Sequence, residues 1–260
     1  MRSLTLLVPV FNESSLIDEF LAKTTDDLSQ SGLDWELILI DDGSADDSLE
    51  KMWAFSKDKP RIKVISLGSN HGPGLNYLRG FAMATKEHVA WATVDAFYDT
   101  RILPELMRHL DQYSSVSAYR TDLSGHTPMR RLQTVANVLI MRVLFPRFKF
   151  KAYHTLQIHR VDFIHAIRIE AVTPFMCSEL LFKARALGLN IKEVGIEYLP
   201  RKKGKATGGN PKLIKRHVAE MLRFWMRWVV FRRPVIDPSV SIPPVSATRA
   251  EVGEVVRASA

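Results

Sequence analysis

Ile38-Leu39-Ile40-Asp41-Asp42-Gly43-Ser44 carries three apolar residues directly into two adjacent carboxylates and a Gly-Ser turn. This order is typical of a buried parallel strand that ends at a polar ligand site. The same design occurs earlier, where an apolar run from Leu4 leads through Pro9 to Asn12 and Glu13. Because the carboxyl ends of parallel strands share one edge of a sheet, both segments should border one crevice, where open α/β folds bind ligands. They predict an enzyme that holds a nucleotide there.

Strands and helices alternate through the first hundred residues. The hydrophobic pattern predicts strands near residues 3–10, 35–41, 62–67 and 88–95, and helices near 14–30, 46–57 and 73–85. Such alternation indicates βαβ units and a mostly parallel central sheet flanked by helices. The fourth predicted strand ends in Asp95, so three strands bring acidic residues to the same edge. The predicted fold class is therefore α/β.

The pattern is looser after residue 100. It predicts helices near 102–112, 129–145, 176–187 and 211–231, and strands near 115–121 and 191–198. The Pro-, Ser-, Val- and Ala-rich sequence at the end predicts a flexible tail over residues 233–260. We therefore predict a single domain over residues 1–232, with a nucleotide-binding half at 1–99 and an acceptor half at 100–232.

Charge and composition limit the partners. The chain has 260 residues and a net charge of +8, with the excess mostly in its second half, which favours phosphorylated substrates, anionic lipid or nucleic acid. No nucleic-acid-binding motif accompanies this charge, so nucleic acid ranks last. A single cysteine, Cys177, excludes an internal disulfide and is predicted to be buried. Without a signal peptide or an apolar run long enough to span a bilayer, we predict a cytoplasmic protein or one bound to a membrane face.

Two predicted helices mix apolar residues with arginine, at 129–145 and 211–231. In the second, Phe224, Trp225 and Trp228 stand beside arginines, as in a helix that lies on an anionic membrane. The alternative is a helix that packs on the core and has a basic outer face. The sequence leaves both interpretations open.

The chain resembles the family 2 nucleotide-sugar glycosyltransferases of GT-A fold in Val8–Glu13, in Ile40–Ser44 and in Asp95 at a strand end. Within that family the likeness is strongest to dolichol- and polyprenyl-phosphate sugar transferases. Asn70–Gly74, with the helix that follows it, and the basic segment Arg201–Ala206 carry this part of the resemblance. The likeness covers residues 3–232. It implies an inverting transfer, in which the acceptor attacks the anomeric carbon as the nucleoside diphosphate leaves.

The resemblance implies a donor site at the sheet edge. It assigns nucleotide-sugar contacts to Pro9, Phe11, Glu13, Asp41, Asp42, Arg79, Asp95, Arg201 and Lys205. The first three would border the base, and Asp41 or Asp42 would accept hydrogen bonds from the base or the ribose. The alternative for Asp41–Ser44 is a turn that caps the next helix. The loop that holds Arg201 and Lys205 would close over the donor, or is simply a solvated basic loop.

The metal motif departs from the family pattern. The family carries Asp-x-Asp at the fourth strand end, where oxygen ligands suit Mg²⁺ or Mn²⁺. Here Asp95 is followed by Ala96 and Phe97, so Asp99 is the nearest substitute for the second carboxylate. We predict Asp95 and Asp99 as metal ligands, and Asp95, Asp99 and Glu179 as the catalytic residues. Asp99 and Glu179 are the candidate bases if the acceptor is a hydroxyl.

The predicted acceptor site also departs from the family pattern. Where the family shows an arginine associated with phosphate groups, this chain has Gln157. Arg131, Arg160 and His154 are the candidates that could compensate for the missing charge, and we predict Gln157, Arg131 and Arg160 at the acceptor phosphate.

These predictions combine into one function. We expect a sugar to move from a GDP- or UDP-sugar to a polyprenyl phosphate at the cytoplasmic membrane face. Alternatives are a polysaccharide or small-molecule hydroxyl acceptor, or a degenerate nucleotide-sugar-binding protein without turnover. A binding module for anionic lipid or nucleic acid is the hypothesis from another class.

Overall fold

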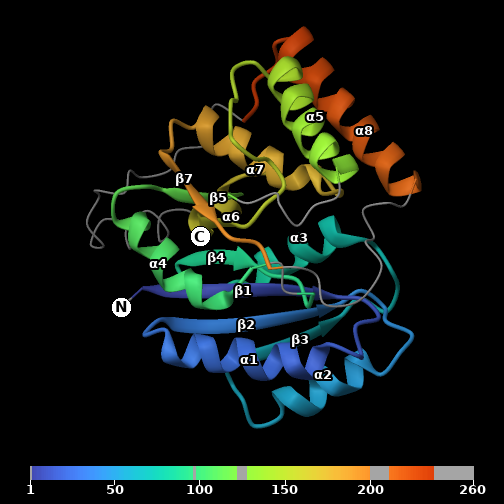
Figure 1. Cartoon of the computed structure of the whole chain (residues 1–260), viewed down its shortest axis with the longest axis vertical. Helices are drawn as coiled ribbons and strands as arrows, with labels where there is room; N and C mark the ends of the chain where they lie inside the picture. The colour runs from blue at the N-terminus through green and yellow to red at the C-terminus, as the bar shows by residue number, and fades with distance from the viewer. Residues whose placement is uncertain (1, 96–97, 122–127, 200–210, 237–260) are drawn as a thin grey trace, which may run out of the picture.

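The structure is a computed structural model that describes residues 2–95, 98–121, 128–199 and 211–236. Its centre is a seven-stranded sheet with the order β3-β2-β1-β4-β6-β5-β7 (Figure 1). The strands are β1 (Ser3–Val10), β2 (Asp34–Asp41), β3 (Ile62–Ser66), β4 (His88–Trp91), β5 (Ser115–Arg120), β6 (Gln157–Arg160) and β7 (Ile191–Ile196). The first four strands are parallel, and β6 runs antiparallel to both of its neighbours. This confirms the predicted mostly parallel α/β sheet.

Helices flank the sheet. They are α1 (Ile17–Gln30), α2 (Ser48–Ser56), α3 (Pro73–Met83), α4 (Leu103–Arg108), α5 (Pro128–Leu144), α6 (Val161–Ala166), α7 (Phe175–Ala186) and α8 (Pro211–Trp225). Three differences from prediction stand out. The helix expected at 102–112 is the short α4 between two 3-10 turns, and the last predicted helix changes to a π-helical turn over Met226–Val230. The short elements β6 and α6 were not predicted.

The central strands are buried on both faces, so their side chains alternate between two cores. Leu4, Leu6 and Val8 face one core with residues of α1, α2 and α4. Leu7, Ile38 and Ile40 face the other, which includes residues of α3, α5, α6, α7 and α8. This alternation explains why the β1 and β2 sequences are almost continuously apolar.

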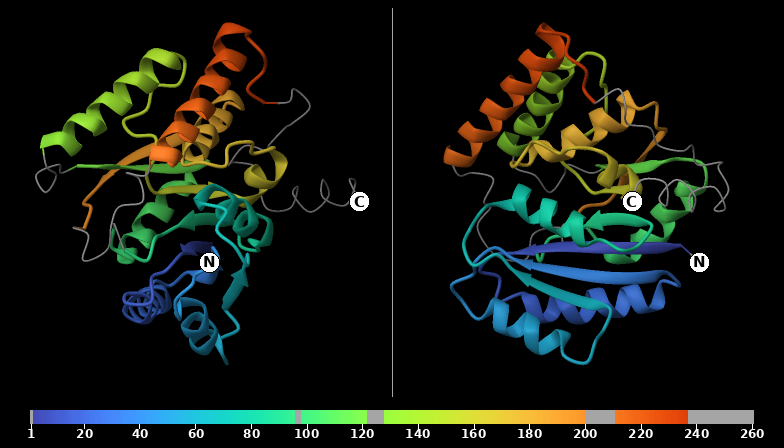
Figure 2. Two further views of the ribbon diagram at one scale, coloured as in Figure 1. Left: turned by 90° about the vertical axis from the view of Figure 1, so that its right-hand side faces the viewer. Right: turned by 180° about the vertical axis from the view of Figure 1, so that it is seen from behind.

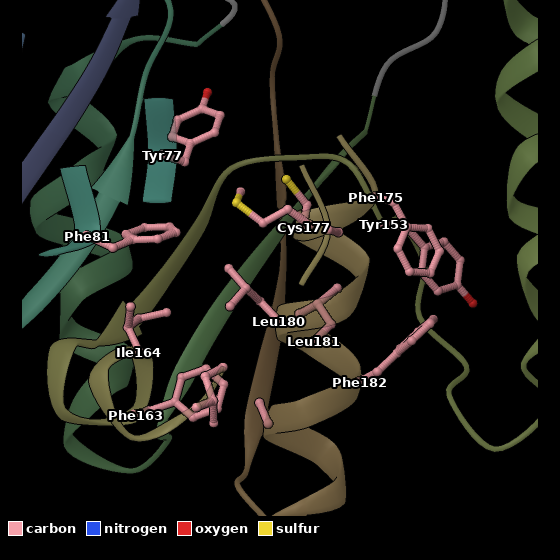
Figure 3. Close-up of a cluster of buried hydrophobic side chains, with 14 of the residues drawn as sticks. Tyr77, Phe81, Tyr153, Phe163, Ile164, Phe175, Cys177, Leu180, Leu181 and Phe182 are labelled. Atoms are coloured by element: carbon pink, nitrogen blue, oxygen red, sulfur yellow. The ribbon is translucent and has the colours of Figure 1, made fainter. Parts of the chain in front are cut away.

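The second core is rich in aromatic rings. Figure 3 shows α7 at its centre, with Cys177 and Leu180 on the side of Tyr77 and Phe81, and Phe182 directed toward Tyr153 and Phe175. Cys177 is buried, as predicted, and burial raises the pKa of its thiol to about 12.

Helices α5 and α8 lie at the end of the molecule away from β1, β2 and β3 (Figure 2). Their C-terminal ends meet, where the rings of Phe145 and Trp228 are 6.4 Å apart. Phe224 and Trp228 are buried in the core rather than exposed, so these two aromatic residues follow the core-packing interpretation. Within the described ranges, no helix is both long enough and apolar enough to cross a bilayer.

Candidate active site

The first two strands end level with each other, because Val10 and Asp41 are partners in the β1–β2 register. The loops that follow are then joined by hydrogen bonds. The Asn12 N–H donates to Ser44 Oγ at 3.0 Å, and Asn12 Oδ1 accepts from the Ala45 N–H at 2.8 Å. Asn12 has a left-handed backbone (φ 55°), a conformation that asparagine tolerates better than most residues. The Asn-Glu and Asp-Asp-Gly-Ser segments therefore form one structural unit at the carboxyl edge.

Asp41 is directed into the protein. Its carboxylate accepts hydrogen bonds from the Gly43 and Ser44 N–H groups, at 3.2 and 3.0 Å, and from Ser66 Oγ at 2.9 Å. The side chain is buried, and its oxygens are used to form the turn and to hold β3. This geometry matches the turn interpretation for Asp41.

Asp42 organises the next loop. Its two oxygens accept hydrogen bonds from the backbone N–H groups of His71, at 2.7 Å, and Gly72, at 3.0 Å. Asp42 is also buried, so in this state it shapes the crevice through the backbone of the loop after β3. A carboxylate that accepts two backbone N–H groups is a strong and directional anchor.

Two glycines permit close contacts around this loop. A Cβ on Gly43 would lie 2.5 Å from Ser69 Cα, and Gly43 has a positive φ of 74°. A Cβ on Gly74 would lie 2.2 Å from the carbonyl oxygen of Val172. The loop after β3 therefore packs tightly between the Asp42 turn and the segment before α7.

Several predicted donor-site residues remain accessible at this edge. The Phe11 ring is 38% exposed, while Pro9 and Glu13 are half-buried. His71, which was not predicted as a site residue, is exposed and its Nε2 lies 3.0 Å from Ser69 Oγ. The signal for His71 was present in the Asn70–Gly74 segment, but only the loop and not this side chain was singled out.

Asp95 follows β4 at the same edge and is half-buried. Thr93 Oγ1 donates a hydrogen bond to its carboxylate. The residue also lines a mainly apolar pocket together with Phe20, Lys23 and Tyr98. Of the predicted metal ligands and bases, Asp95 is the one that lines this pocket.

Asp99 has a different environment. Its oxygens accept hydrogen bonds from the Arg101 guanidinium, at 2.6 to 3.1 Å, and from Lys23 Nζ at 3.1 Å. The hydrogen bonds from Arg101 hold the pKa of Asp99 below its usual range, which makes it a weak base. These contacts argue against the predicted roles of Asp99 as second metal ligand and as base.

Glu179 lies in the core, in the middle of α7 rather than at its start. Its carboxylate accepts hydrogen bonds from the backbone N–H groups of Glu170 and Ala171, the latter at 2.8 Å, and lies 2.7 Å from Lys183 Nζ. The side chain is fully buried. It therefore anchors the segment before α7, and this geometry argues against the predicted catalytic role.

The predicted acceptor-phosphate residues do not come together. Gln157 is fully buried, where its Nε2 donates to the Cys177 carbonyl at 3.1 Å. Arg160 is the partner of His88 at the start of β4, so the antiparallel β6 carries it to the opposite edge of the sheet, where it pairs with Asp162. These placements contradict the predictions for Gln157 and Arg160.

Other predicted residues are only partly defined. Arg79 is exposed on α3. Arg131 belongs to α5, but its side chain is not described. Phe97, Arg201 and Lys205 lie outside the described residues, as do residues 237–260 of the predicted tail.

The described residues offer a limited metal site. Within them, no group of three or more His, Cys, Asp or Glu side chains is arranged to hold a metal ion. Of the predicted metal ligands, Asp95 lines the pocket described above, so a Mg²⁺ or Mn²⁺ ion there would need substrate oxygens and water as its other ligands.

The edge geometry and fold agree with comparisons to known proteins. The family model for glycosyl transferase family 2 matches residues 5–174, and the chain belongs to this family of glycosyltransferases. A curated relative, the undecaprenyl-phosphate 4-deoxy-4-formamido-L-arabinose transferase of Salmonella typhimurium, is 26% identical over 144 residues. That match covers 55% of this chain and 44% of the relative, so the chain matches less than half the length of that protein.

Solved structures show the same fold. Glucosyl-3-phosphoglycerate synthase from Mycobacterium tuberculosis, in complex with UDP, aligns with a TM-score of 0.65 at 16% identity, covering 86% of this chain and 80% of that one. S. aureus TarS 1-349 in complex with UDP-GlcNAc aligns with a TM-score of 0.62 at 18% identity, covering 86% and 65%. The GT-A fold predicted from the sequence is thereby confirmed.

Proposed function

We propose that this glycosyltransferase moves a sugar, with inversion, from a GDP- or UDP-sugar to a polyprenyl phosphate at the cytoplasmic face of a membrane. The donor would lie at the carboxyl edge formed by the loops after β1, β2 and β3 and by Asp95. The curated relatives are named as undecaprenyl-phosphate sugar transferases, and the solved neighbours were crystallised with UDP or a UDP-sugar. The second fact supports a nucleotide-sugar donor, and the first supports the lipid acceptor.

The acceptor proposal rests on the environments of the two predicted bases, Asp99 and Glu179. Glu179 is buried against Lys183, and Asp99 is held by Arg101 and Lys23. A sugar hydroxyl needs a base to take its proton, whereas a phosphate monoester is already ionised and needs little such help. The engaged carboxylates therefore favour a phosphate acceptor over a hydroxyl acceptor.

In this proposal Phe11 and Glu13 border the base, and Asp42 fixes the loop that forms the next wall of the crevice. Asp95 faces the diphosphate and would hold Mg²⁺ or Mn²⁺ together with diphosphate oxygens, as Mn²⁺ accompanies UDP in a structure of the mycobacterial enzyme. When bound, the ion would stabilise the negative charge of the leaving diphosphate. Arg79, Arg201 and Lys205 are proposed to add positive charge to the same leaving group.

A transfer assay tests the proposal. Purified protein is incubated with labelled UDP-glucose or GDP-mannose and with undecaprenyl phosphate or a neutral oligosaccharide, in Mn²⁺ or in excess chelator. The proposal expects label in the organic phase only with the lipid phosphate, and loss of that label on chelation. Label on the oligosaccharide instead would contradict the acceptor, and label unaffected by the chelator would contradict the metal.

A further inference from the structure

Helices α5 and α8 each carry a row of exposed aliphatic side chains. On α5 the row is Leu132, Val135, Leu139 and Val143, which are 58 to 69% exposed. On α8 and the π-helical turn it is Ile214, Val218, Leu222, Met226 and Val230. The members recur every three or four residues, so each row lies along one side of its helix. We call the two rows together the two-helix face.

The charge around this face has one sign. The sequence of α5 contains no acidic residue, and the only acid in α8 is Glu220, which is buried and accepts hydrogen bonds from the Val172 and Thr173 N–H groups. Exposed basic residues include Arg142 on α5 and Lys215, Arg216 and Arg223 on α8. Apolar rows on helices whose exposed charged residues are basic are typical of helices that lie on anionic lipid.

The C-terminal ends of the two helices lie close together (Figure 2). Residues from both ends line a pocket. The residues that line it include three aromatic ones, Phe145, Phe148 and Trp228, and three exposed arginines, Arg147, Arg232 and Arg233. We call it the arginine pocket.

The backbone and one buried donor shape this pocket. Arg232 adopts a left-handed conformation (φ 51°), and the Arg233 N–H donates to the Arg227 carbonyl at 3.0 Å, which turns the chain back beside the end of α5. Trp228 is only 3% exposed, and its indole N–H has no hydrogen-bond partner. The Trp228 side chain is one of those that line the pocket.

We propose that the arginine pocket binds the phosphate of an anionic phospholipid head group while the two-helix face lies on the acyl chains beside it. Guanidinium groups bind phosphate through paired, charge-assisted hydrogen bonds, and the aliphatic rows gain free energy by leaving water. A second copy of the chain is a poorer occupant, because a symmetric contact would bring the basic residues of both faces together. This site is distinct from the donor crevice and stands independently of the proposed transfer reaction.

Vesicle co-sedimentation tests the proposal on the full chain. Wild type should bind mixed POPC/POPG vesicles and not POPC alone. The triple variant Arg147→Ala/Arg232→Ala/Arg233→Ala should bind roughly a hundredfold more weakly, since each basic residue at an anionic surface adds about a factor of five. A matched variant, Lys57→Ala/Lys59→Ala/Arg108→Ala, removes the same charge outside the face and should change binding less than about threefold, because salt screens distant charges. Circular dichroism establishes that each variant is folded.

Two further experiments distinguish a phospholipid head group from other ligands of the arginine pocket and the two-helix face. Leu139→Glu/Val143→Glu should abolish vesicle binding without altering the oligomeric state measured by light scattering. Glycerol 3-phosphate, as the soluble head-group probe, should compete only at millimolar concentration. If both triple variants lost vesicle binding to the same extent, the proposed role of the arginine pocket would be wrong. Saturable glycerol 3-phosphate binding without vesicle binding, or a dimer that the Leu139→Glu/Val143→Glu change dissociates, would also contradict the proposal.

Discussion

The carboxylate of Asp42, at the end of β2, accepts a hydrogen bond of 2.7 Å from the backbone N–H of His71, in the loop after β3. The same carboxylate holds the neighbouring Gly72 N–H. Two strand ends are thus joined by one side chain, which holds the backbone of a loop at the proposed donor site.

Removing this carboxylate should affect stability and nucleotide binding together. We expect Asp42→Ala to lower the free energy of unfolding by about 1–3 kcal/mol, because two N–H groups lose their acceptor. UDP or GDP affinity, measured by calorimetry, should fall as well, because the loop is no longer held. Glu50→Ala removes an exposed charge from nearby α2 and is the control. Undiminished nucleotide affinity in Asp42→Ala would show that the loop does not form the site.

The contact between Gly74 and Val172 gives a second prediction. An alanine at position 74 would place Cβ 2.2 Å from the Val172 carbonyl oxygen, and this backbone atom cannot rotate away. We expect Gly74→Ala to destabilise the protein by about 1–3 kcal/mol in chemical denaturation, despite the better helix propensity of alanine. In Gly195→Ala the nearest atom is Thr121 Cγ2, at 2.4 Å, in a side chain that can move. If the two variants were equally stable, the close packing at Gly74 would be refuted.

Glu179 should prove structural rather than catalytic. Glu179→Ala leaves the buried Lys183 without its counter-ion, and such changes cost about 3–5 kcal/mol. The double variant Glu179→Met/Lys183→Met should be less destabilised, because no buried charge remains. In whichever variant folds, kcat per folded molecule should stay within about twofold of wild type. A kcat reduced by orders of magnitude in the stable double variant would restore Glu179 as a catalytic residue.

A buried histidine predicts the response to acid. His159 Nδ1 lies 2.9 Å from Ser115 Oγ and Nε2 lies 2.9 Å from Gln157 Oε1, and burial lowers the pKa of His159 from 6.5 to about 3. Below pH 6.5 the His159 imidazole binds a proton in the unfolded chain but stays neutral in the folded chain. The contribution of the neutral, buried His159 to the free energy of unfolding is therefore complete above pH 6.5. It is lost as the pH falls toward 3, by about 1.4 kcal/mol per pH unit.

Unfolding by urea at a series of pH values measures this effect. We expect His159→Phe to reduce the slope of the free energy of unfolding against pH, between pH 6 and pH 4, by the equivalent of about one bound proton. Ser115→Ala removes a hydrogen bond but keeps the imidazole, so its slope should match wild type. A wild-type slope in His159→Phe would mean that this histidine is not responsible.

The sequence was a good guide to the fold because the central strands are buried on both faces. Their nearly continuous apolar runs, separated by amphipathic helices, leave few other architectures. The prediction from sequence failed at β6, a strand of four residues with three polar side chains, two of them buried in a hydrogen-bonded group. Without β6, the direction that carries Arg160 to the opposite edge was not predictable.

The sequence predicts acidic residues at the strand ends, but not the contacts that each of them makes. Asp41 and Asp42 are adjacent and chemically identical, yet the first closes its own turn and the second holds the next loop. That difference depends on the position of the loop after β3, which no local pattern encodes. Asp99 and Glu179 show the same limit, since their partners Lys23 and Lys183 become apparent only once the chain is folded.

In the proposed function, the carboxyl edge containing Asp95 transfers a sugar from a nucleotide donor. The most direct measurement compares wild type with Asp95→Asn for two quantities in the same preparations, the rate of sugar transfer to undecaprenyl phosphate and the affinity for UDP or GDP without metal. We predict that transfer falls by at least a hundredfold in Asp95→Asn, about 3 kcal/mol of lost transition-state stabilisation, while the metal-free affinity changes little. Equal transfer rates in the two proteins would contradict the assignment of this edge as the active site.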